Sequence, residues 1–405
     1  MNTTLLLVAY AFPPENVSGA ARPFRFYRYL PEFGISPLVI TASQQVHEKP
    51  DVVFVRDVPR ELPRKSFSWH LERIVRKFLL PGQSGLSWSR DAAARGCKLI
   101  PGHHRAAVLS TSPPISVHLA ALRIKRKLRI PWIADFRDPM HPSADVVPRK
   151  KSIYTILEAF FFKHADAIIA NTDAVARLWS ARYPDHREKI HVIWNGFDPD
   201  EVISAAPIPQ RKFKHIVHVG ELYAGRHPGP ILASVQRLIV RGALLPESLR
   251  LSLIGPSSDA AIPDIDVVRQ LARIGIVEYV PFQISRDKAR LIACQADALL
   301  LLQPQSGLHL PAKIFEYVRI GRPILALVRR DSPSEHILSR CGIAYRAVYP
   351  DDPSEQVDRK LLEFFALPSD PVAPNNWFVE QFDALRQTEA LSSIVERLVH
   401  RGRGN

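Results

Sequence analysis

The stretch PAKIFEYVRIGRPILAL, Pro311–Leu327, places a cation and a carboxylate at the start of a short helical pattern. Proline suits the first helical position and glycine the residue just past a helix end, so we predict a helix over Pro311–Ile320, closed by Gly321 and followed by a buried strand. Such a helix N-terminus attracts anions, and Lys313 adds a full charge. Glu316 would lie close enough to the same helix N-terminus to accept hydrogen bonds from a sugar hydroxyl of the bound ligand. An ordinary helix-to-strand connection has the same punctuation.

The elements around this stretch repeat one pattern along the chain. Apolar runs alternate with longer helical patterns, which is typical of parallel sheets with crossover helices. One series begins at TLLLVAYAF and ends at KIHVIWNGFD, and a second begins at KHIVHVG and ends at IAYRAVY. Between the two series, residues 199–214 are polar and rich in proline. We therefore predict two α/β domains, residues 1–198 and 215–375, joined by a linker at 199–214 and followed by a helical segment at 376–405.

In open α/β sheets, ligands bind beyond the carboxyl ends of the strands, so the residues that follow each run are the candidates. After the first run, Gly19 and Ala20 allow a backbone to come close to a ligand and Arg22 supplies charge. The absence of GxGxxG there argues against a conventional dinucleotide site. A plain strand-to-helix loop fits these residues equally well.

Two further segments of the first half end in polar side chains. In IADFRDPMH, the carboxylates of Asp135 and Asp138 flank Arg137 and precede His141, and they could orient an acceptor hydroxyl or tune one another's protonation. A structural Asp–Arg pair is the alternative, with Asp135 nearer the strand interior. In TSPPISVHL, the hydroxyl of Thr111 could line a cleft, although we favour helix capping by this turn.

The second half offers a matching loop in HVGELYAGRHPGP. Gly220 and Gly225 permit close approach, while Arg226 and His227 can reach a diphosphate. Basic side chains on a surface loop are the alternative. Gly307, before the predicted helix, could let the backbone turn toward the same ligand.

Taken in order, these segments resemble glycosyltransferase family 4, whose retaining enzymes have the GT-B architecture of two Rossmann-like domains facing across a cleft. AYAFPPENVSGAARP is similar to the family's N-terminal glycine loop and WIADFRDPM to a first-domain motif. HVGELYAGRHP is similar to the entry to the donor domain, and PAKIFEYVRIGRPILAL to the second half of the paired-glutamate signature. The resemblance implies a GT-B fold in which the helix at 376–405 crosses back to the first domain. That helix could equally pack wholly on the second domain.

The resemblance also implies a role for individual residues. Glu316 would bind the ribose of a nucleotide sugar, Arg226 and Lys313 its diphosphate, and Asp138 would lie beside the transferred sugar or the acceptor. These four are the expected catalytic residues. The expected donor-binding set adds the glycine-loop and second-domain residues Gly19, Ala20, Gly220, Gly307, Leu308, His309 and Leu310. The expected acceptor-side set is Arg22, Thr111, Arg137, Asp138 and His141.

Two positions depart from the family pattern. Leu308 stands where the paired-glutamate signature has its first acid, and Glu221 stands where many members carry a phosphate-binding arginine. We therefore expect backbone N–H groups around Gly307–Leu310 to help orient the sugar. The implied reaction is glycosyl transfer from a nucleoside diphosphate sugar, UDP-sugar being favoured, to an acceptor hydroxyl. The resemblance implies that no metal and no cofactor takes part, and we find no acidic cluster of metal-site type.

Charge is unevenly distributed along the 405 residues, whose net charge is +14. Residues 1–200 carry 29 Lys plus Arg against 18 Asp plus Glu, and the remaining residues carry 25 against 22. Three segments combine the excess with apolar residues: KSFSWHLERIVRKFLLPG, RIKRKLRI and PRKKSIYTILEAFFFKH. Such surfaces suit anionic lipid, so we predict peripheral attachment to the cytoplasmic face of a bacterial membrane and a lipid-linked saccharide acceptor. The apolar residues could equally be core, with the charges on a solvated face.

Other function classes remain open from composition alone. The three widely spaced cysteines fit a reducing cytoplasm, and the apolar start has no preceding basic region, so it fits a first strand better than a signal peptide. A nucleic-acid-binding protein would explain the charge, but we find no recognised binding motif and expect no nucleic acid partner. A sugar-nucleotide epimerase of the same architecture is the closer alternative.

Overall fold

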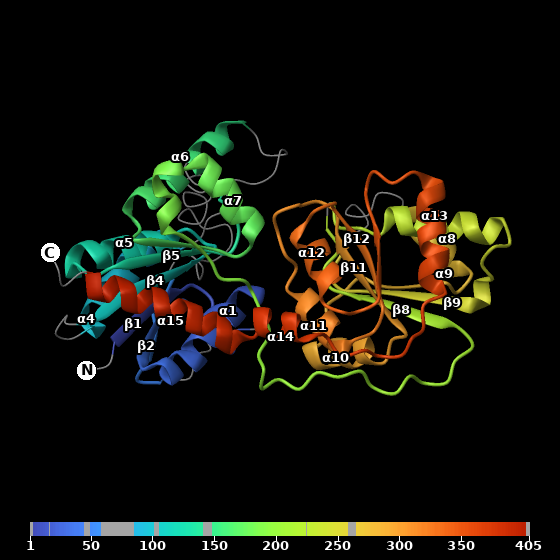
Figure 1. Ribbon diagram of the computed structural model, residues 1–405, viewed down its shortest axis with the longest axis horizontal. Helices are drawn as coiled ribbons and strands as arrows, with labels where there is room; N and C mark the ends of the chain where they lie inside the picture. Colours follow the sequence, from blue (N-terminus) through green and yellow to red (C-terminus); the bar gives the residue numbers. More distant parts are fainter. Residues whose placement is uncertain are drawn as a thin grey trace, which may run out of the picture. The chain divides into compact units, whose positions relative to one another are not determined.

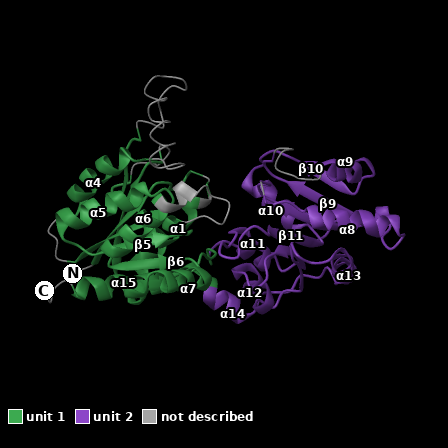
Figure 2. Cartoon of the chain, turned by 90° about the horizontal axis from the view of Figure 1, so that it is seen from above, with its two compact units in different colours: residues 1–199, 382–405 green, residues 200–381 purple. Residues whose placement is uncertain are grey.

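The computed structural model describes residues 3–15, 17–43, 49–57, 85–100, 105–140, 148–223, 225–257 and 265–401. The chain divides into two compact units, each with its own parallel sheet (Figure 2). The first unit comprises residues 1–199 and 382–405, and the second comprises 200–381. The expected α/β class with two Rossmann-like sheets is thereby confirmed.

The first unit is built on a seven-stranded sheet in the order β3-β2-β1-β4-β5-β6-β7, in which all neighbours pair in parallel. The chain winds outward in both directions from the pair β1–β4, and ligands bind beyond the carboxyl ends of strands at such a switch point. Its strands are β1 (Thr3–Ala9), β2 (Ile35–Thr41), β3 (Val52–Phe54), β4 (Ala106–Ser112), β5 (Trp132–Phe136), β6 (Ala167–Ala170) and β7 (Ile190–Val192).

Helices cover both faces of this sheet, which explains why its central strands are apolar on both sides. On one face, α1 (Ser18–Tyr29) and α15 (Ala384–Arg401) pack against Leu5, Leu7 and Leu109, as the course of α15 along β1 in Figure 1 shows. On the other face lie α4 (Trp88–Leu99) and α5 (Ser116–Leu128). Helix α4 packs so closely there that a Cβ at Gly96 would lie 3.0 Å from the Leu6 side chain. The unit is completed by η1 (Leu30–Phe33), α6 (Pro148–His164), α7 (Asp173–Arg182) and η2 (Pro184–Lys189).

The second unit repeats this plan with a six-stranded parallel sheet in the order β10-β9-β8-β11-β12-β13, whose switch point is the pair β8–β11. Its strands are β8 (Lys214–Val219), β9 (Leu249–Ile254), β10 (Val277–Val280), β11 (Ala298–Gln303), β12 (Ile324–Val328) and β13 (Tyr345–Val348). Its helices are α8 (Gly229–Val240), η3 (Pro246–Ser248), α9 (Ile265–Arg273), α10 (Arg286–Cys294), α11 (Lys313–Ile320), α12 (Pro333–Arg340), α13 (Ser354–Phe365) and α14 (Asn376–Phe382).

The chain leaves the first unit and returns to it at neighbouring positions. Phe197 N–H donates to Phe382 O at 2.9 Å, and Ala384 N–H donates to Phe197 O at 2.9 Å. Gly196 is required beside this pairing, since a Cβ there would lie 2.1 Å from Phe382 O. The helical pattern at 376–405 is therefore two helices, α14 and α15, divided at Asp383, and α15 belongs to the first unit.

The segment expected to be a linker is attached along its length to the second unit. Ala206 N–H donates to Cys294 O at 3.0 Å, and Arg322 donates to Ala206 O at 2.8 Å. Further along, Arg211 donates to Gln295 O at 2.8 Å. Its proline-rich composition thus produces an extended strap on the surface of that unit.

A buried ion pair fixes the carboxyl end of β5 in the first unit. Arg22 on α1 donates from Nε and Nη2 to the two carboxylate oxygens of Asp135, both at 2.9 Å, and both side chains are almost fully buried. Its other N–H groups donate to Trp194 O, Ile193 O and Asn195 Oδ1. All five guanidinium N–H groups are therefore used within the unit. The structural Asp–Arg pair that the sequence allowed exists, but its arginine is Arg22 and not Arg137.

Removing this guanidinium should destabilise the first unit strongly. Because Asp135 would be left buried and unpaired, we expect Arg22→Ala to lower the free energy of unfolding by about 3 to 5 kcal/mol. Arg28→Ala is the matched control, since Arg28 is 42% exposed in its pair with Asp198 and should cost less than about 1 kcal/mol. Urea unfolding followed by tryptophan fluorescence measures both, because five of the six tryptophans precede Pro199. Equal losses in the two variants contradict the assignment.

Candidate active site

The helix that carries Lys313 and Glu316 begins later than the sequence predicts. Helix α11 spans Lys313–Ile320, with Ala312 as its N-cap residue and Pro311 one residue before the cap. Its C-terminal end is as predicted, since Gly321 adopts the left-handed conformation with φ of 80°. Lys313 and Glu316 both therefore lie in the first helical turn.

Two side chains of α11 hold the end of strand β8. Lys313 Nζ donates to Val219 O at 2.7 Å, and Val219 N–H donates to the hydroxyl oxygen of Tyr317 at 3.0 Å. Residues four apart lie on the same face of a helix, which lets Lys313 and Tyr317 both reach the backbone of one residue, Val219. The helix start is thereby fixed beside the switch point of the sheet.

Gly220 follows Val219 and makes room for the ammonium group. Its φ is 143°, and a Cβ at this position would lie 2.0 Å from Lys313 Nζ. His218 approaches from the other side, with Nε2 3.5 Å from Nζ while Nδ1–H donates to Leu300 O at 2.9 Å. Gly220 therefore serves the placement of Lys313, a requirement that the sequence does not reveal.

Removal from water changes the protonation of this group. Burial, and after it the positive charge of Arg226, lower the pKa of Lys313 to about 7 against the opposing effect of Glu316. Burial, followed by the charge of Lys313, holds the pKa of His218 well below its usual value. A neutral His218 presents an Nε2 lone pair to Lys313. This contact accommodates the ammonium group without compensating its positive charge.

Arg226 lies in the loop after β8 and contacts the end of β11. Its guanidinium stacks on Tyr223, with Cζ 4.7 Å from the ring centroid, and Nη2 donates to Gln303 Oε1. Its Nε is buried and has no acceptor among the described residues. Arg226 and Lys313 are thus two cations at the carboxyl ends of β8 and β11 whose hydrogen-bonding capacity is only partly used by the protein.

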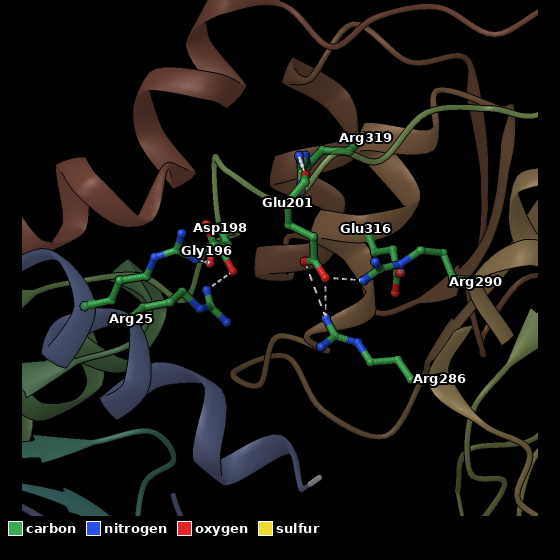
Figure 3. Close-up of polar contacts among 9 residues, drawn as sticks. Arg25, Gly196, Asp198, Glu201, Arg286, Arg290, Glu316 and Arg319 are labelled. Atoms are coloured by element: carbon green, nitrogen blue, oxygen red, sulfur yellow. Dashed lines mark hydrogen bonds and ion pairs between the residues drawn. The ribbon is translucent and has the colours of Figure 1, made fainter. Parts of the chain in front are cut away.

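Glu316 belongs to a cluster of charged side chains. Its Oε1 accepts from Arg290 Nε at 2.7 Å, and Arg290 Nη2 donates to Glu201 Oε1 at 2.5 Å. Arg286 also donates to Glu201, at 3.2 Å (Figure 3). Sequence reasoning missed Arg286 and Arg290, although two arginines four apart on an amphipathic helix were a usable signal.

The segment before α11 differs from the expectation. The backbone N–H groups of Leu308 and His309 both donate to Ser306 Oγ at 3.1 Å, so these two amides are occupied within the loop. A Cβ at Gly307 would meet no described atom within 4 Å, and Leu310 is buried. The free amide donors expected from this segment to orient a sugar are therefore reduced.

In the first unit, Asp138 lines a cavity of about 220 Å³ beyond the ends of β4 and β5. The other described lining residues are Ser112, Pro113, Ile115, Pro139, Met140 and Tyr154. The cavity is mostly apolar, with the exposed carboxylate of Asp138 at its edge. It has the composition that a ligand with one apolar face and a few hydroxyls requires.

The other first-unit candidates have structural partners. Gly19 and Ala20 lie in the first turn of α1, and a Cβ at Gly19 would come within 2.7 Å of Arg137 Nη1. Arg137 donates to Ser112 O and Pro113 O, both at 2.8 Å, and so holds the turn beside the cavity. Arg22 has no N–H left for an acceptor, as described above.

The capping expectation for the turn after β4 is wrong. Thr111 lies within β4, and α5 begins at Ser116 after Ile115 with no capping hydrogen bond from a side chain. The Thr111 hydroxyl is buried without a hydrogen-bond partner among the described residues. His141 lies outside the described residues.

Glu158 on α6 was not singled out from the sequence, yet it positions the loop of Asp138. It is fully buried; its Oε2 accepts from Met140 N–H at 3.0 Å, and its Oε1 accepts from Arg182 and the Tyr183 hydroxyl. A single acid inside the apolar run TILEAFFF was the available signal. Burial and Glu158 together raise the pKa of Tyr183.

A protein-family model matches part of the chain. Residues 24–201 match Glycosyltransferase Family 4. This match covers less than half of the chain and lies almost wholly within the first unit. No relative among curated proteins matches the chain by sequence.

Solved structures with the same fold align with nearly the whole chain. A trehalose-phosphate synthase from Burkholderia vietnamiensis aligns with a TM-score of 0.66 at 12% identity, covering 99% of this chain and 100% of the other. Sucrose-phosphate synthase from Thermosynechococcus elongatus aligns with a TM-score of 0.62 at 12% identity, covering 100% of this chain and 99% of the other. Anabaena HepE in complex with UDP and glucose aligns with a TM-score of 0.59 at 12% identity, covering 98% of this chain and 100% of the other. Both the family match and the fold are similar to those of glycosyltransferases with the GT-B architecture.

Two features are absent from the residues that the structure describes. None of their helices is both long and apolar enough to cross a membrane. They also contain no group of three or more His, Cys, Asp or Glu side chains arranged to hold a metal ion.

The altered pKa of Lys313 leads to a pH-dependent stability. The unfolded lysine has a pKa of 10.5 and the folded one about 7, so the unfolded state binds more protons between these values. The free energy of unfolding of the second unit should therefore rise with pH from about 7 to 10. His218, Arg226 and Glu316 face the group and stay in place in the variant Lys313→Met.

Calorimetric unfolding of wild type and Lys313→Met from pH 6 to pH 10 measures this effect. We expect the variant to be the more stable of the two at pH 7 and below, and the difference to shrink as pH rises. Two curves that run parallel across this range would show that Lys313 keeps an ordinary pKa.

Proposed function

We propose that this protein transfers a glycosyl group from a nucleoside diphosphate sugar, with UDP-sugars favoured, to an acceptor hydroxyl. The observation that carries the proposal is the pair of incompletely bonded cations, Lys313 and Arg226, at the carboxyl ends of β8 and β11. A diphosphate supplies the anionic acceptors that these groups lack. One HepE structure is a complex with UDP and glucose, and another is a complex with UDP-glucose. These complexes support the choice of a UDP-sugar as donor.

The chemistry follows from where negative charge develops. As the bond between the sugar and the diphosphate breaks, charge builds on the departing phosphate oxygens, and fixed cations beside them lower the barrier. In our proposal Lys313 and Arg226 stabilise this leaving group and Glu316 accepts hydrogen bonds from the ribose. Transfer with retention and without a metal ion or cofactor is part of the same proposal.

We assign the acceptor to the cavity of the first unit. Asp138 offers a carboxylate that can accept a hydrogen bond from the attacking hydroxyl, while the surrounding Ile115, Met140 and Tyr154 suit the apolar face of a sugar ring. Arg137 and Glu158 hold the two sides of this cavity through the backbone of Pro113 and Met140. A lipid-linked saccharide in the assembly of a surface polysaccharide is the acceptor class that we favour.

A basic and apolar surface of the first unit supports action at a membrane. On α6, Ile156 is 67% and Phe160 36% exposed, and the exposed basic residues Arg126, Lys127 and Arg129 lie at the C-terminal end of α5. Lys125 Nζ donates to His164 O at 2.8 Å and so joins the ends of these two helices. This surface fits peripheral binding to anionic lipid on the cytoplasmic face of the membrane. The basic segment at 65–82 lies outside the described residues.

Donor turnover tests the reaction. With the sugar nucleotide that is consumed fastest in a panel, we expect Arg226→Ala and Glu316→Ala to lower kcat/KM by roughly tenfold to a hundredfold, since each removes a charge-assisted hydrogen bond. Lys212→Ala, an exposed lysine of the same unit, is the control. Unchanged turnover in both site variants contradicts the donor assignment. Conversion of the sugar nucleotide alone into an isomeric product would indicate the epimerase instead.

Liposome flotation tests the membrane surface. Wild type should float with vesicles that contain anionic lipid at low salt and less so at high salt, because exposed charges are screened. The double variant Ile156→Asp and Phe160→Asp should lose most of this binding. Val240→Asp, which alters an 82% exposed side chain on α8 in the second unit, should retain it. If wild type binds at neither salt concentration, membrane attachment through this surface is refuted.

A further inference from the structure

The charged cluster around Glu316 contains an arginine with two carboxylate partners. Arg290 projects from α10, and its Nε donates to Glu316 Oε1 at 2.7 Å while its Nη2 donates to Glu201 Oε1 at 2.5 Å. Figure 3 shows the guanidinium of Arg290 lying between these two carboxylates. The planar group presents donors at fixed angles, so holding one carboxylate determines where the other can lie.

Glu201 is itself held from two directions. Its carboxylate accepts from Arg286 at 3.2 and 3.4 Å, and its backbone oxygen accepts from Arg319 on α11 (Figure 3). Arg319 is three residues beyond Glu316 on the same helix. The strap residue Glu201 therefore links α10, which carries Arg290, to α11, which carries Glu316.

The geometry leaves part of Glu316 available. The carboxylate is 29% exposed, and its Oε2 accepts no hydrogen bond within the part of the chain that the structure describes. Arg290 is only 21% exposed, so its charge is weakly screened by water. One oxygen is thus fixed by the protein and the other remains free for a hydroxyl donor.

Charge balance gives a second reason for the arrangement. Glu316 lies in the same helical turn as Lys313, so an uncompensated carboxylate there would repel a diphosphate bound at the helix start. Pairing with Arg290 offsets this repulsion and leaves one carboxylate oxygen of Glu316 to accept hydrogen bonds from hydroxyls.

We propose that Arg290 is a positioning residue that holds Glu316 ready for the ribose diol of a nucleoside diphosphate, with Glu201 fixing Arg290 in turn. Arg290 does not itself touch the ligand. The inference rests on the proposed donor function and adds two residues to it. It assigns a function to the first residues of the proline-rich strap.

Comparing two ligands that differ only in the ribose separates this role from general support of the fold. The probes are UDP and 2′,3′-dideoxy-UDP, with dissociation constants measured by titration calorimetry on the full chain. We expect Arg290→Gln to weaken UDP binding about tenfold, the loss typical of a charge-assisted hydrogen bond, and to change dideoxy-UDP binding less than about twofold. Steady-state kinetics should show the change in KM and not in kcat, because ribose binding is the same in ground and transition states.

Related variants sharpen the comparison. Arg290→Lys should recover part of the UDP affinity, since an ammonium can pair with Glu316 but cannot bridge both carboxylates. Glu201→Gln should show a smaller loss with the same dependence on the ribose hydroxyls. Lys288→Gln is the matched control, because Lys288 is an exposed cation of the same helix, and it should bind both ligands as wild type does. Thermal unfolding checks that each variant is folded.

The outcomes are distinguishable. Equal weakening of UDP and dideoxy-UDP by Arg290→Gln overturns the positioning role and leaves donor binding intact. Tighter UDP binding by the variant also overturns it, since Arg290 would then compete with the ribose for Glu316. If wild type binds neither UDP nor its dideoxy analogue, the proposed UDP-sugar function fails first, and the inference fails with it.

Discussion

The organisation of both units depends on a cation taken out of water at the carboxyl ends of the central strands. Removing a charge from water is costly unless acceptors surround it, so each cation dictates the residues around it. In the first unit the guanidinium of Arg22 draws together Asp135 and the backbone of Ile193 and Trp194. In the second, the ammonium of Lys313 requires the carbonyl of Val219, a neutral His218 and the absence of a side chain at Gly220.

Much of the fold follows from local sequence because buried parallel strands are apolar on both faces. Runs such as TLLLVAYAF and DALLLL have no solvated side and are bounded by turn residues, so their strand character is evident without knowledge of their neighbours. Partners of buried charges do not follow in this way. Arg22 and Asp135 are 113 residues apart, whereas Arg137, the nearest arginine in sequence to Asp135, belonged to the structural pair that the sequence left open as an alternative.

The candidate site was predictable to the extent that its residues follow strand ends. Arg226, Lys313 and Glu316 occupy such positions, and inspection of strand ends was sufficient to select them. Arg290 and Tyr317 lie within amphipathic helices, where periodicity shows which side is polar but not which neighbouring element the polar groups meet. Composition was also uninformative for residues 199–214, because a proline-rich segment reads as a spacer whether or not its few N–H and C=O groups find partners.

The degree to which each cation is satisfied separates structural residues from candidate functional ones. Arg22 has an acceptor for every N–H, so it can contribute to stability but has nothing left to offer a ligand. Arg226 retains a buried Nε without an acceptor among the described residues, and Lys313 is held by one carbonyl and a long contact to a neutral imidazole. Buried donors without acceptors lower the stability of the folded protein. Such donors are best explained where a bound anion supplies the missing acceptors. Under the proposed function, the same reasoning accounts for the charge-compensated carboxylate of Glu316 beside them, since it would serve the ribose without repelling the diphosphate.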